Sequence, residues 1–187
     1  MKTLPIPLLM VIFVSCLGSL SAAGAKDVEV INFLSMFRHP DDTYEKGYQY
    51  AFGDWEGKKV AQIPGKGLLV NLAGSKGGVG DNQGPDFRKH TKARLSFIIG
   101  NRNLATSFIF TLVDRDGTDQ SFDVSLGNLP RGTEQTVTVD LTKPSRENKP
   151  GGTPGLNLKK LETWQLTGNF QAEPIEILFL RVVAVSD

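Results

Sequence analysis

The sequence contains little of what several kinds of functional site require. Its 187 residues include one cysteine and two histidines, and its formal net charge is +1. One cysteine cannot form an internal disulfide or a cysteine-rich zinc site, and two histidines leave little material for a multi-histidine metal centre. A near-neutral charge balance also lacks the basic face of a nucleic-acid-binding protein. We therefore expect no metal, no cofactor and no nucleic-acid partner.

The one long hydrophobic run lies at the amino terminus. Lys2 precedes an apolar stretch over 4–17, and small residues follow as far as Ala23-Gly24-Ala25. This arrangement is typical of a secretory signal peptide with an A-x-A cleavage site, and the run is short for a spanning helix. We predict a signal peptide over 1–25, one domain over 26–187, and a secreted, periplasmic or cell-envelope location.

Cleavage after Ala25 would also remove Cys16 and Lys2. The remaining chain would carry 20 basic and 20 acidic residues and no thiol. Its stability would then come from core packing, without disulfides. An alternative stays open, because Phe13-Val14-Ser15-Cys16 loosely resembles a bacterial lipobox, with phenylalanine where leucine is usual. A membrane partner is expected only if Cys16 is lipidated.

Beyond the signal segment, the dominant hydrophobic period is two, which predicts β-strands. Apolar and polar residues alternate over four stretches: 94–99, 108–113, 121–126 and 136–141. Further strands are predicted over 28–33 and 66–72. The stretch 175–185 is apolar on both faces, as in a central strand that is covered on each side. No helix longer than a turn or two is indicated, with one short turn over 157–162.

About eight strands at this spacing predict an all-β fold, an antiparallel two-sheet sandwich. Asp114 to Gly117 predicts a hairpin turn, favoured over a calcium loop because Ser125 stands at the twelfth position, where such a loop needs glutamate. Gly74 to Gly80 resembles part of a nucleotide-binding loop, but Asp81 stands where phosphate would lie, so a flexible loop between strands is preferred. Lys143 to Gly155 is predicted to be a long surface loop.

Five aromatic residues fall within a segment of twelve: Tyr44, Tyr48, Tyr50, Phe52 and Trp55. If 48–52 is a strand, its three rings share one face. Flat rings with polar edges suit sugar recognition, because the apolar face of a pyranose can stack on them. The alternative is that this row is core. Trp164, which shares a face with Leu166, is predicted to be core.

Two histidines lie beside acids: His39 near Asp41 and Asp42, and His90 near Asp86. A metal site of two histidines and a carboxylate is an alternative for these residues, as is a general base. Surface histidines near acids are common, however. No spacing of a catalytic triad or of paired carboxylates is present.

From Lys92 onward, the order of segments is similar to carbohydrate-binding modules of the jelly-roll, galactose-binding-like type. The similar segments are Leu95-Ser96-Phe97, Asn103-Leu104-Ala105, Phe110 to Thr118, Val137 to Leu141, Gly155 to Leu158, and Leu161 to Leu166. The resemblance covers about half of the chain and concerns strand order and turn style. It implies a jelly-roll β-sandwich that is secreted, non-catalytic and binds a glycan.

Two departures from that family accompany the resemblance. Such modules often hold a structural calcium between acidic residues of their first and last strands. The corresponding stretches here are Asn32-Phe33-Leu34 and Leu178 to Arg181, which lack the carboxylates and add a cation. We expect no calcium at this position. Such modules also usually accompany a catalytic domain, which this sequence does not contain.

The sequence thus predicts a secreted jelly-roll sandwich that binds a polysaccharide or another glycan. The predicted ligand-binding residues are Tyr44, Tyr48, Tyr50, Trp55, Asp86, Arg88, His90 and Asn101. The alternative is an envelope or extracellular domain that binds a protein partner. A small polysaccharide hydrolase or lyase is a third hypothesis, which depends on His90 and the acids near it.

Overall fold

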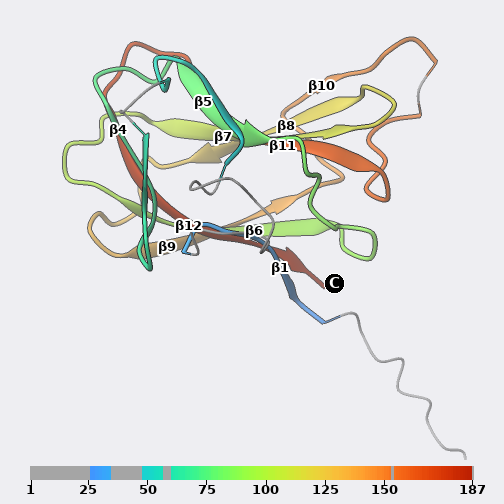
Figure 1. The fold of residues 1–187 in the computed structure, drawn as a ribbon, viewed down its shortest axis with the longest axis horizontal. Coiled ribbons are helices and arrows are strands. Elements are labelled where there is room, and N and C mark those ends of the chain that lie inside the picture. Colours follow the sequence, from blue (N-terminus) through green and yellow to red (C-terminus); the bar gives the residue numbers. More distant parts are fainter. Residues whose placement is uncertain (1–25, 35–47, 57–59, 153, 187) are drawn as a thin grey trace, which may run out of the picture.

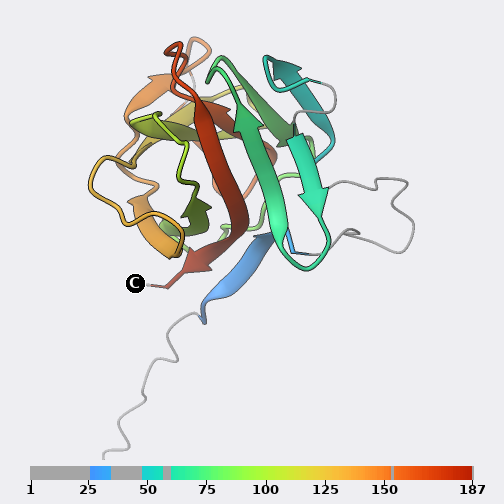
Figure 2. The same ribbon diagram turned by 90° about the vertical axis from the view of Figure 1, so that its left-hand side faces the viewer.

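The computed structural model of the chain describes residues 26–34, 48–56, 60–152 and 154–186. These residues form twelve strands and no helix. The strands make two six-stranded antiparallel sheets that face each other (Figures 1 and 2). The predicted all-β, two-sheet antiparallel jelly-roll sandwich is confirmed. In the described ranges, no helix has the length and apolarity needed to span a membrane. The predicted signal peptide, 1–25, lies outside them.

Sheet A is the lower layer in Figure 1 and is centred on the last strand of the chain. Its strands, in spatial order, are β3 (Val60–Ile63), β4 (Gly67–Leu72), β12 (Ile175–Val185), β6 (Lys92–Ile99) and β9 (Glu134–Asp140), with β1 (Val28–Asn32) paired to β12. β4 pairs with the first half of β12 and β1 with the second half. Strands from both ends of the chain therefore meet in one sheet.

Sheet B is the upper layer. Its strands, in spatial order, are β10 (Arg146–Asn148), β8 (Asp119–Ser125), β7 (Ser107–Asp114), β11 (Leu161–Gly168), β5 (Gly77–Asp81) and β2 (Tyr50–Gly53). β7 and β8 form the predicted hairpin, in which Gly117 has a φ of 82°. The Asp114 carboxylate accepts hydrogen bonds from three backbone N–H groups, those of Asp116, Thr118 and Asn157. Asp114 therefore stabilises the turn.

The core lies between the sheets and follows from the period of two. Phe108, Phe110 and Leu112 on β7 are buried toward sheet A, as the alternation predicted. Rings from the two layers interlock: Phe108 of sheet B makes edge contacts with Phe97 and Phe179 of sheet A, at centroid distances of 5.1 and 5.0 Å. The fully buried Trp164 meets Phe33 at 5.6 Å, so its predicted core position is confirmed.

Three expectations about strands are wrong. The segment 74–80 was predicted to be a flexible loop, but its residues from Gly77 onward belong to strand β5, which lies between β11 and the edge strand β2 in sheet B. Residues 146–148, within the predicted long loop, pair with β8 as β10. β3 is too short for its alternation to be detected in the sequence. The structure therefore contains twelve strands where about eight were predicted. β12 is central, as predicted, but the outward side chain of Leu178 is only half-buried.

Candidate functional site

The outer face of sheet B, which points away from β12 and β6 in Figure 1, is hollowed into a groove of about 460 Å³. β2, β7, β8, β10 and β11 all contribute to it. Its lining residues are Phe52, Ile109, Thr111, Val113, Asp119, Ser121, Arg146, Glu147, Asn148, Gln165, Thr167 and Phe170. We call this hollow the sheet B groove.

The antiparallel register places the groove residues in rows across the sheet. In one row, Gln165, Thr111, Ser121 and Arg146 line the groove as successive cross-strand partners. Gly80 and Tyr50 continue this row beyond Gln165 to β2. Neighbouring strands are about 4.8 Å apart, so the row extends roughly 24 Å from β2 to β10. An aromatic edge, a mixed centre and a polar edge therefore follow one another along the groove.

The aromatic edge consists of two rings on β2. Tyr50 and Phe52 both point outward, and their ring centroids are 6.4 Å apart with an interplanar angle of 32°. They lie over glycines of β5: a Cβ on Gly78 would be 2.8 Å from Cζ of Phe52, and a Cβ on Gly80 would be 2.5 Å from the Tyr50 hydroxyl. The glycines of this segment therefore make room for rings that lie close against the sheet.

The Tyr50 ring is held by its neighbour on β11. Nε2 of Gln165 donates a hydrogen bond of 3.1 Å to the Tyr50 hydroxyl. Burial is the main cause that raises the pKa of Tyr50 above its ordinary value, and the nearby charge of Asp81 adds to the effect. The hydroxyl therefore stays protonated at neutral pH and can donate a hydrogen bond to a ligand while it accepts one from Gln165.

The polar edge is formed by β8 and β10. Asn148 donates to Asp119 at 3.1 Å, and Arg146 pairs with Asp123 at 3.2 Å. Between the two edges, the hydroxyls of Thr111 and Ser121 lie 2.9 Å apart. Each of these groups has donor or acceptor capacity beyond the bonds it already makes. This edge can therefore bind hydroxyl groups of a ligand.

A third aromatic ring lies at the rim of the groove, in the connection from β11 to β12. Phe170 is 49% exposed and has a φ of 61°, in the left-handed region. A bulky residue adopts this conformation only at a cost, and the backbone N–H of Phe170 donates a hydrogen bond of 3.2 Å to the Ser75 carbonyl oxygen, which helps to hold the turn. Phe170 therefore offers an exposed ring at the rim of the groove.

Glu147 also lines the groove, but its electrostatics do not favour proton donation. A hydrogen bond from Lys149, followed by one from Gln120, lowers the pKa of Glu147 below its ordinary value. A general acid at neutral pH needs a raised pKa. The geometry of the groove therefore suits binding by stacking and hydrogen bonding.

The predicted aromatic residues are separated by the structure. Tyr50 lies at the groove edge, and Tyr44 lies outside the described residues. The prediction that Tyr48 and Trp55 present exposed rings is wrong, because they are 3% and 0% exposed and belong to the core. The strand begins only at Tyr50, so the period of two does not extend to Tyr48. After Phe52 the chain turns at Gly53, with a φ of 63°, which directs Trp55 inward.

The predicted polar residues do not surround the groove. Asp86, Arg88 and His90 precede β6, whereas Asn101 follows it. The two groups are thus separated by the length of an eight-residue strand, roughly 25 Å. Arg88 and Asp86 form an exposed ion pair at 2.5 Å, and hydrogen bonds from Arg88 lower the pKa of Asp86 to about 2. The structure does not bring these residues and Tyr50 into one site.

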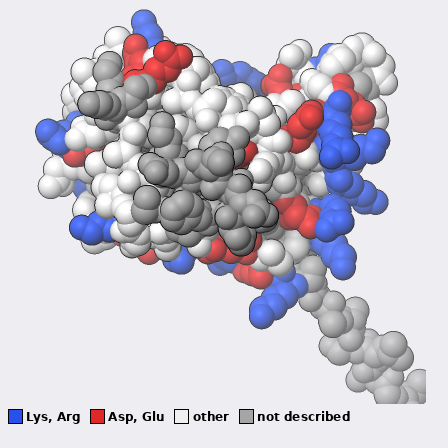
Figure 3. Space-filling model, viewed as in Figure 1, with Lys and Arg blue, Asp and Glu red and all other residues white. Residues whose placement is uncertain are grey.

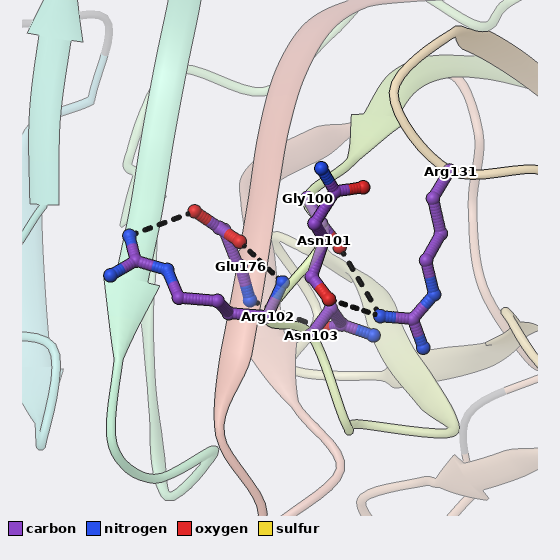
Figure 4. A network of polar contacts seen from close by, with 6 residues as sticks. All are labelled: Gly100, Asn101, Arg102, Asn103, Arg131 and Glu176. Atoms are coloured by element: carbon purple, nitrogen blue, oxygen red, sulfur yellow. Dashed lines mark hydrogen bonds and ion pairs between the residues drawn. The ribbon is translucent and has the colours of Figure 1, made fainter.

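Asn101 belongs to a polar network that ties the β6–β7 turn to β12 (Figure 4). Arg131 donates to the Asn101 carbonyl at 2.9 Å, and Asn103 accepts from the backbone N–H of Glu176 at 3.1 Å. Arg102 pairs with Glu176 at 3.0 Å and lowers the pKa of that carboxyl. These bonds connect the β6–β7 turn to β12 and to the β8–β9 connection, so the network stabilises the turn.

The residues at the calcium position of the resembling modules do not fit a calcium ion. Asn32 uses its side-chain oxygen to accept from the backbone N–H of Leu34. Its register partner Arg181 forms an ion pair with Glu134 at 3.0 Å, so the negative charge of Glu134 is already compensated. Across the described part of the chain, no group of three or more histidine, cysteine or acidic residues could hold a metal. His39 lies outside that part.

Comparison with known proteins identifies the fold. No family model and no curated protein matches the sequence. Among solved structures, CtCBM11, described by its solution structure and binding studies, matches with a TM-score of 0.57 and 13% identity, covering 90% of this chain and 98% of that one. The fold is that of jelly-roll carbohydrate-binding modules.

Two further structures support the module fold. The family 11 carbohydrate-binding module of the cellulosomal cellulase Lic26A-Cel5E of Clostridium thermocellum matches with a TM-score of 0.50 and 14% identity, covering 74% of this chain and 86% of that one. The agarase AgWH50C matches with a TM-score of 0.55 and 12% identity, covering 85% of this chain but 24% of the agarase. At these identities the likeness establishes the module fold alone.

The sequence interpretation missed most of the residues that line the groove of this module fold. Three of these residues, Thr111, Gln165 and Thr167, lie at outward positions of β7 and β11. The alternation of apolar and polar residues indicates these positions. Listing the outward positions of each strand would have found them. Phe170 also had a local signal, as an aromatic between Asn169 and Gln171. Arg146 and Asn148 had none, because β10 is three exposed residues long.

Proposed function

We propose that this protein binds a carbohydrate chain in the sheet B groove. The observation that carries the proposal is the outward ring pair of Tyr50 and Phe52 seated over the glycines of β5, at one end of a groove whose other end is polar. The module fold of the chain supports it. The sugar ring lies with its apolar face on the aromatic edge, and its hydroxyl groups bind Gln165, Thr111 and the side chains of β8 and β10.

The proposal also states that the protein binds the glycan without catalysing a reaction on it. The groove residues offer rings, amides and hydroxyls, and the lowered pKa of Glu147 opposes the role of a proton donor. The predicted signal peptide at 1–25 supports export, which gives such a protein access to polysaccharides outside the cell. We therefore propose an exported, non-catalytic glycan-binding protein.

The test removes the exposed ring at the rim of the groove. Phe170→Ala is expected to weaken binding at least about fivefold, because truncating an aromatic residue at the contact costs about 1 kcal/mol or more. Affinity electrophoresis through gels that contain soluble glucans, galactans or xylans measures the retardation. Phe52→Ala, which removes the ring that β2 contributes to the groove, is expected to have the same effect.

Leu104→Ala provides a matched control. Leu104 is the most exposed large hydrophobic residue described, at 61%, and it lies in the β6–β7 turn away from the groove. The control variant should migrate as the wild type does. Equal retardation of all variants, or none for the wild type on any glycan tested, would contradict the proposal.

A further inference from the structure

A second hollow, of about 830 Å³, lies at one end of the sandwich, between the loop that precedes β6 and the loop that connects β9 to β11. We call it the end cavity. It is lined by Phe87–Thr91, Gln120, Thr142, Pro144, Glu147, Lys149 and Pro154–Lys159. Glu147 lines both this cavity and the sheet B groove, so the two hollows adjoin at β10.

Positive charge gathers at this end of the molecule. Lys and Arg side chains are concentrated on the side of the loop that follows β10 (Figures 1 and 3). Two of the basic residues that line the cavity are paired, Arg88 with Asp86 at 2.5 Å and Lys149 with Glu147 at 2.7 Å. Lys89 and Lys159 form no ion pair with any residue the structure describes. These two ammonium groups are therefore available to an anion.

The cavity wall also holds two buried hydrogen-bond acceptors without donors. Nε2 of His90 lies 3.0 Å from the Lys26 carbonyl oxygen, which can only accept, so Nε2 carries the proton and, in this tautomer, Nδ1 is an acceptor. Gln120 donates through Nε2 to Glu147 at 2.6 Å, which leaves its Oε1 as an acceptor. Neither Nδ1 of His90 nor Oε1 of Gln120 has a partner among the described residues. Both atoms are inaccessible to solvent in this structure, so a ligand hydroxyl can donate to them only after a small shift of the cavity wall.

Free cations beside unpaired acceptors define the chemistry of the ligand. We infer that the end cavity binds a sugar that bears an acidic group, so that this protein prefers acidic polysaccharides. This inference rests on the proposed glycan binding in the sheet B groove and specifies its substrate class. The anionic group meets Lys89 and Lys159, and neighbouring hydroxyls meet His90 and Gln120. A chain in the groove reaches the cavity by passing over Glu147.

The experiment compares acidic polymers with neutral counterparts. Affinity electrophoresis is run with polygalacturonate and its methyl-esterified form, and with a sulfated galactan and agarose. The charged member of at least one pair should bind about tenfold more tightly at low salt, with the difference shrinking as salt screens the charges. The pair that shows the difference identifies the group as carboxylate or sulfate.

Charge reversal locates the site. The double variant Lys89→Glu, Lys159→Glu should lose this preference while its retardation by neutral glycans stays as in the wild type. The matched control Lys66→Glu, Lys76→Glu reverses two exposed lysines that line neither hollow, and it should keep the preference. Retention of the preference by the first variant would overturn the inference.

The remaining outcomes separate this inference from the proposed function. Equal binding of charged and neutral polymers by the wild type contradicts the end-cavity inference and leaves the groove proposal standing. Absence of binding to any glycan contradicts both. Binding of duplex DNA as tightly as the acidic glycan, with the same dependence on Lys89 and Lys159, would also overturn the inference, since the site would then recognise any polyanion.

Discussion

Gly78 and Gly80 face outward on β5, beneath the rings of Phe52 and Tyr50. A Cβ on Gly80 would also lie 2.6 Å from the Trp164 carbonyl oxygen, in addition to its contact with the Tyr50 hydroxyl. Real Cβ atoms do not approach other atoms so closely, and the Trp164 oxygen belongs to the backbone of a neighbouring strand. The size of a single residue therefore decides whether the Tyr50 ring can lie close against the sheet.

The first prediction at this scale concerns Gly80→Ala. The added methyl group should lower the free energy of unfolding by about 1–3 kcal/mol, as overpacking does elsewhere, and should displace the Tyr50 ring. Chemical denaturation measures the first effect and near-ultraviolet circular dichroism the second. Gly127→Ala is the control, because a Cβ there meets nothing within 4 Å. A variant at position 80 as stable as this control would show that the close approach has no energetic consequence.

Individual elements decide which residues reach the surface. β2 presents Tyr50 and Phe52 because alternation holds over its four residues, and it ends where Gly53 turns the chain. Tyr48 and Trp55 lie just outside these limits and are buried. A cluster that is continuous in the sequence is thus divided between a binding face and a core.

The side chain of Asp140 stabilises the turn that follows β9. Asp140 accepts hydrogen bonds from the backbone N–H and the hydroxyl of Thr142, at 2.9 and 2.6 Å, and pairs with Lys143 at 3.2 Å. The hydroxyl of Thr142 is the main cause that lowers the pKa of Asp140 to about 2. A depressed folded-state pKa stabilises the fold above the unfolded value, 3.8, and this contribution disappears as pH falls from 3.8 toward 2.

Asp140→Asn should therefore melt slightly below the wild type at pH 7, by a few degrees at most because the site is at the surface. The difference should close as pH falls below about 3.8. Thermal denaturation at several pH values between 7 and 2 measures it. Asp116→Asn changes an exposed carboxylate that makes no side-chain hydrogen bond or ion pair with the described residues, and it serves as the control. A constant difference at all pH values would contradict the assignment.

At the scale of the whole molecule, the layers are joined by rings and not by covalent bonds. Phe97, Phe108 and Phe179 interlock across the core, and edge contacts of this kind stabilise a pair beyond the area they bury. The described residues contain no cysteine. The stability of this sandwich therefore comes from packing between its two sheets.

The prediction for the whole molecule concerns the mature amino terminus of the exported protein. When the full chain is expressed in a secreting bacterial host, the intact mass of the exported protein should correspond to a chain that begins at Lys26. Its melting temperature should be unchanged by a reducing agent, because that chain has no thiol. A mass that corresponds to an acylated Cys16 would contradict cleavage after Ala25 and favour the lipid-anchored alternative.

The alternation of apolar and polar residues was enough to predict most strands and the two-sheet sandwich. The reason is physical: each face of a strand meets one environment, so a period of two in the sequence becomes a buried and a wet face. The strands over 94–99 and 108–113 show this directly. The glycine-rich β5 and the exposed β10 could not be predicted this way, because their residues carry no such alternation.

Periodicity, turn residues and composition were sufficient to predict the fold class, the hairpin at Asp114, the core position of Trp164 and the presence of aromatic residues near one strand. Strand pairing in the folded protein was needed to show which of those rings face outward and which distant residues join them. The groove combines β2 with β7, β8, β10 and β11, and the end cavity combines His90 with Gln120. Local periodicity assigns each side chain to a face, whereas the pairing of strands distant in the chain determines which faces are adjacent.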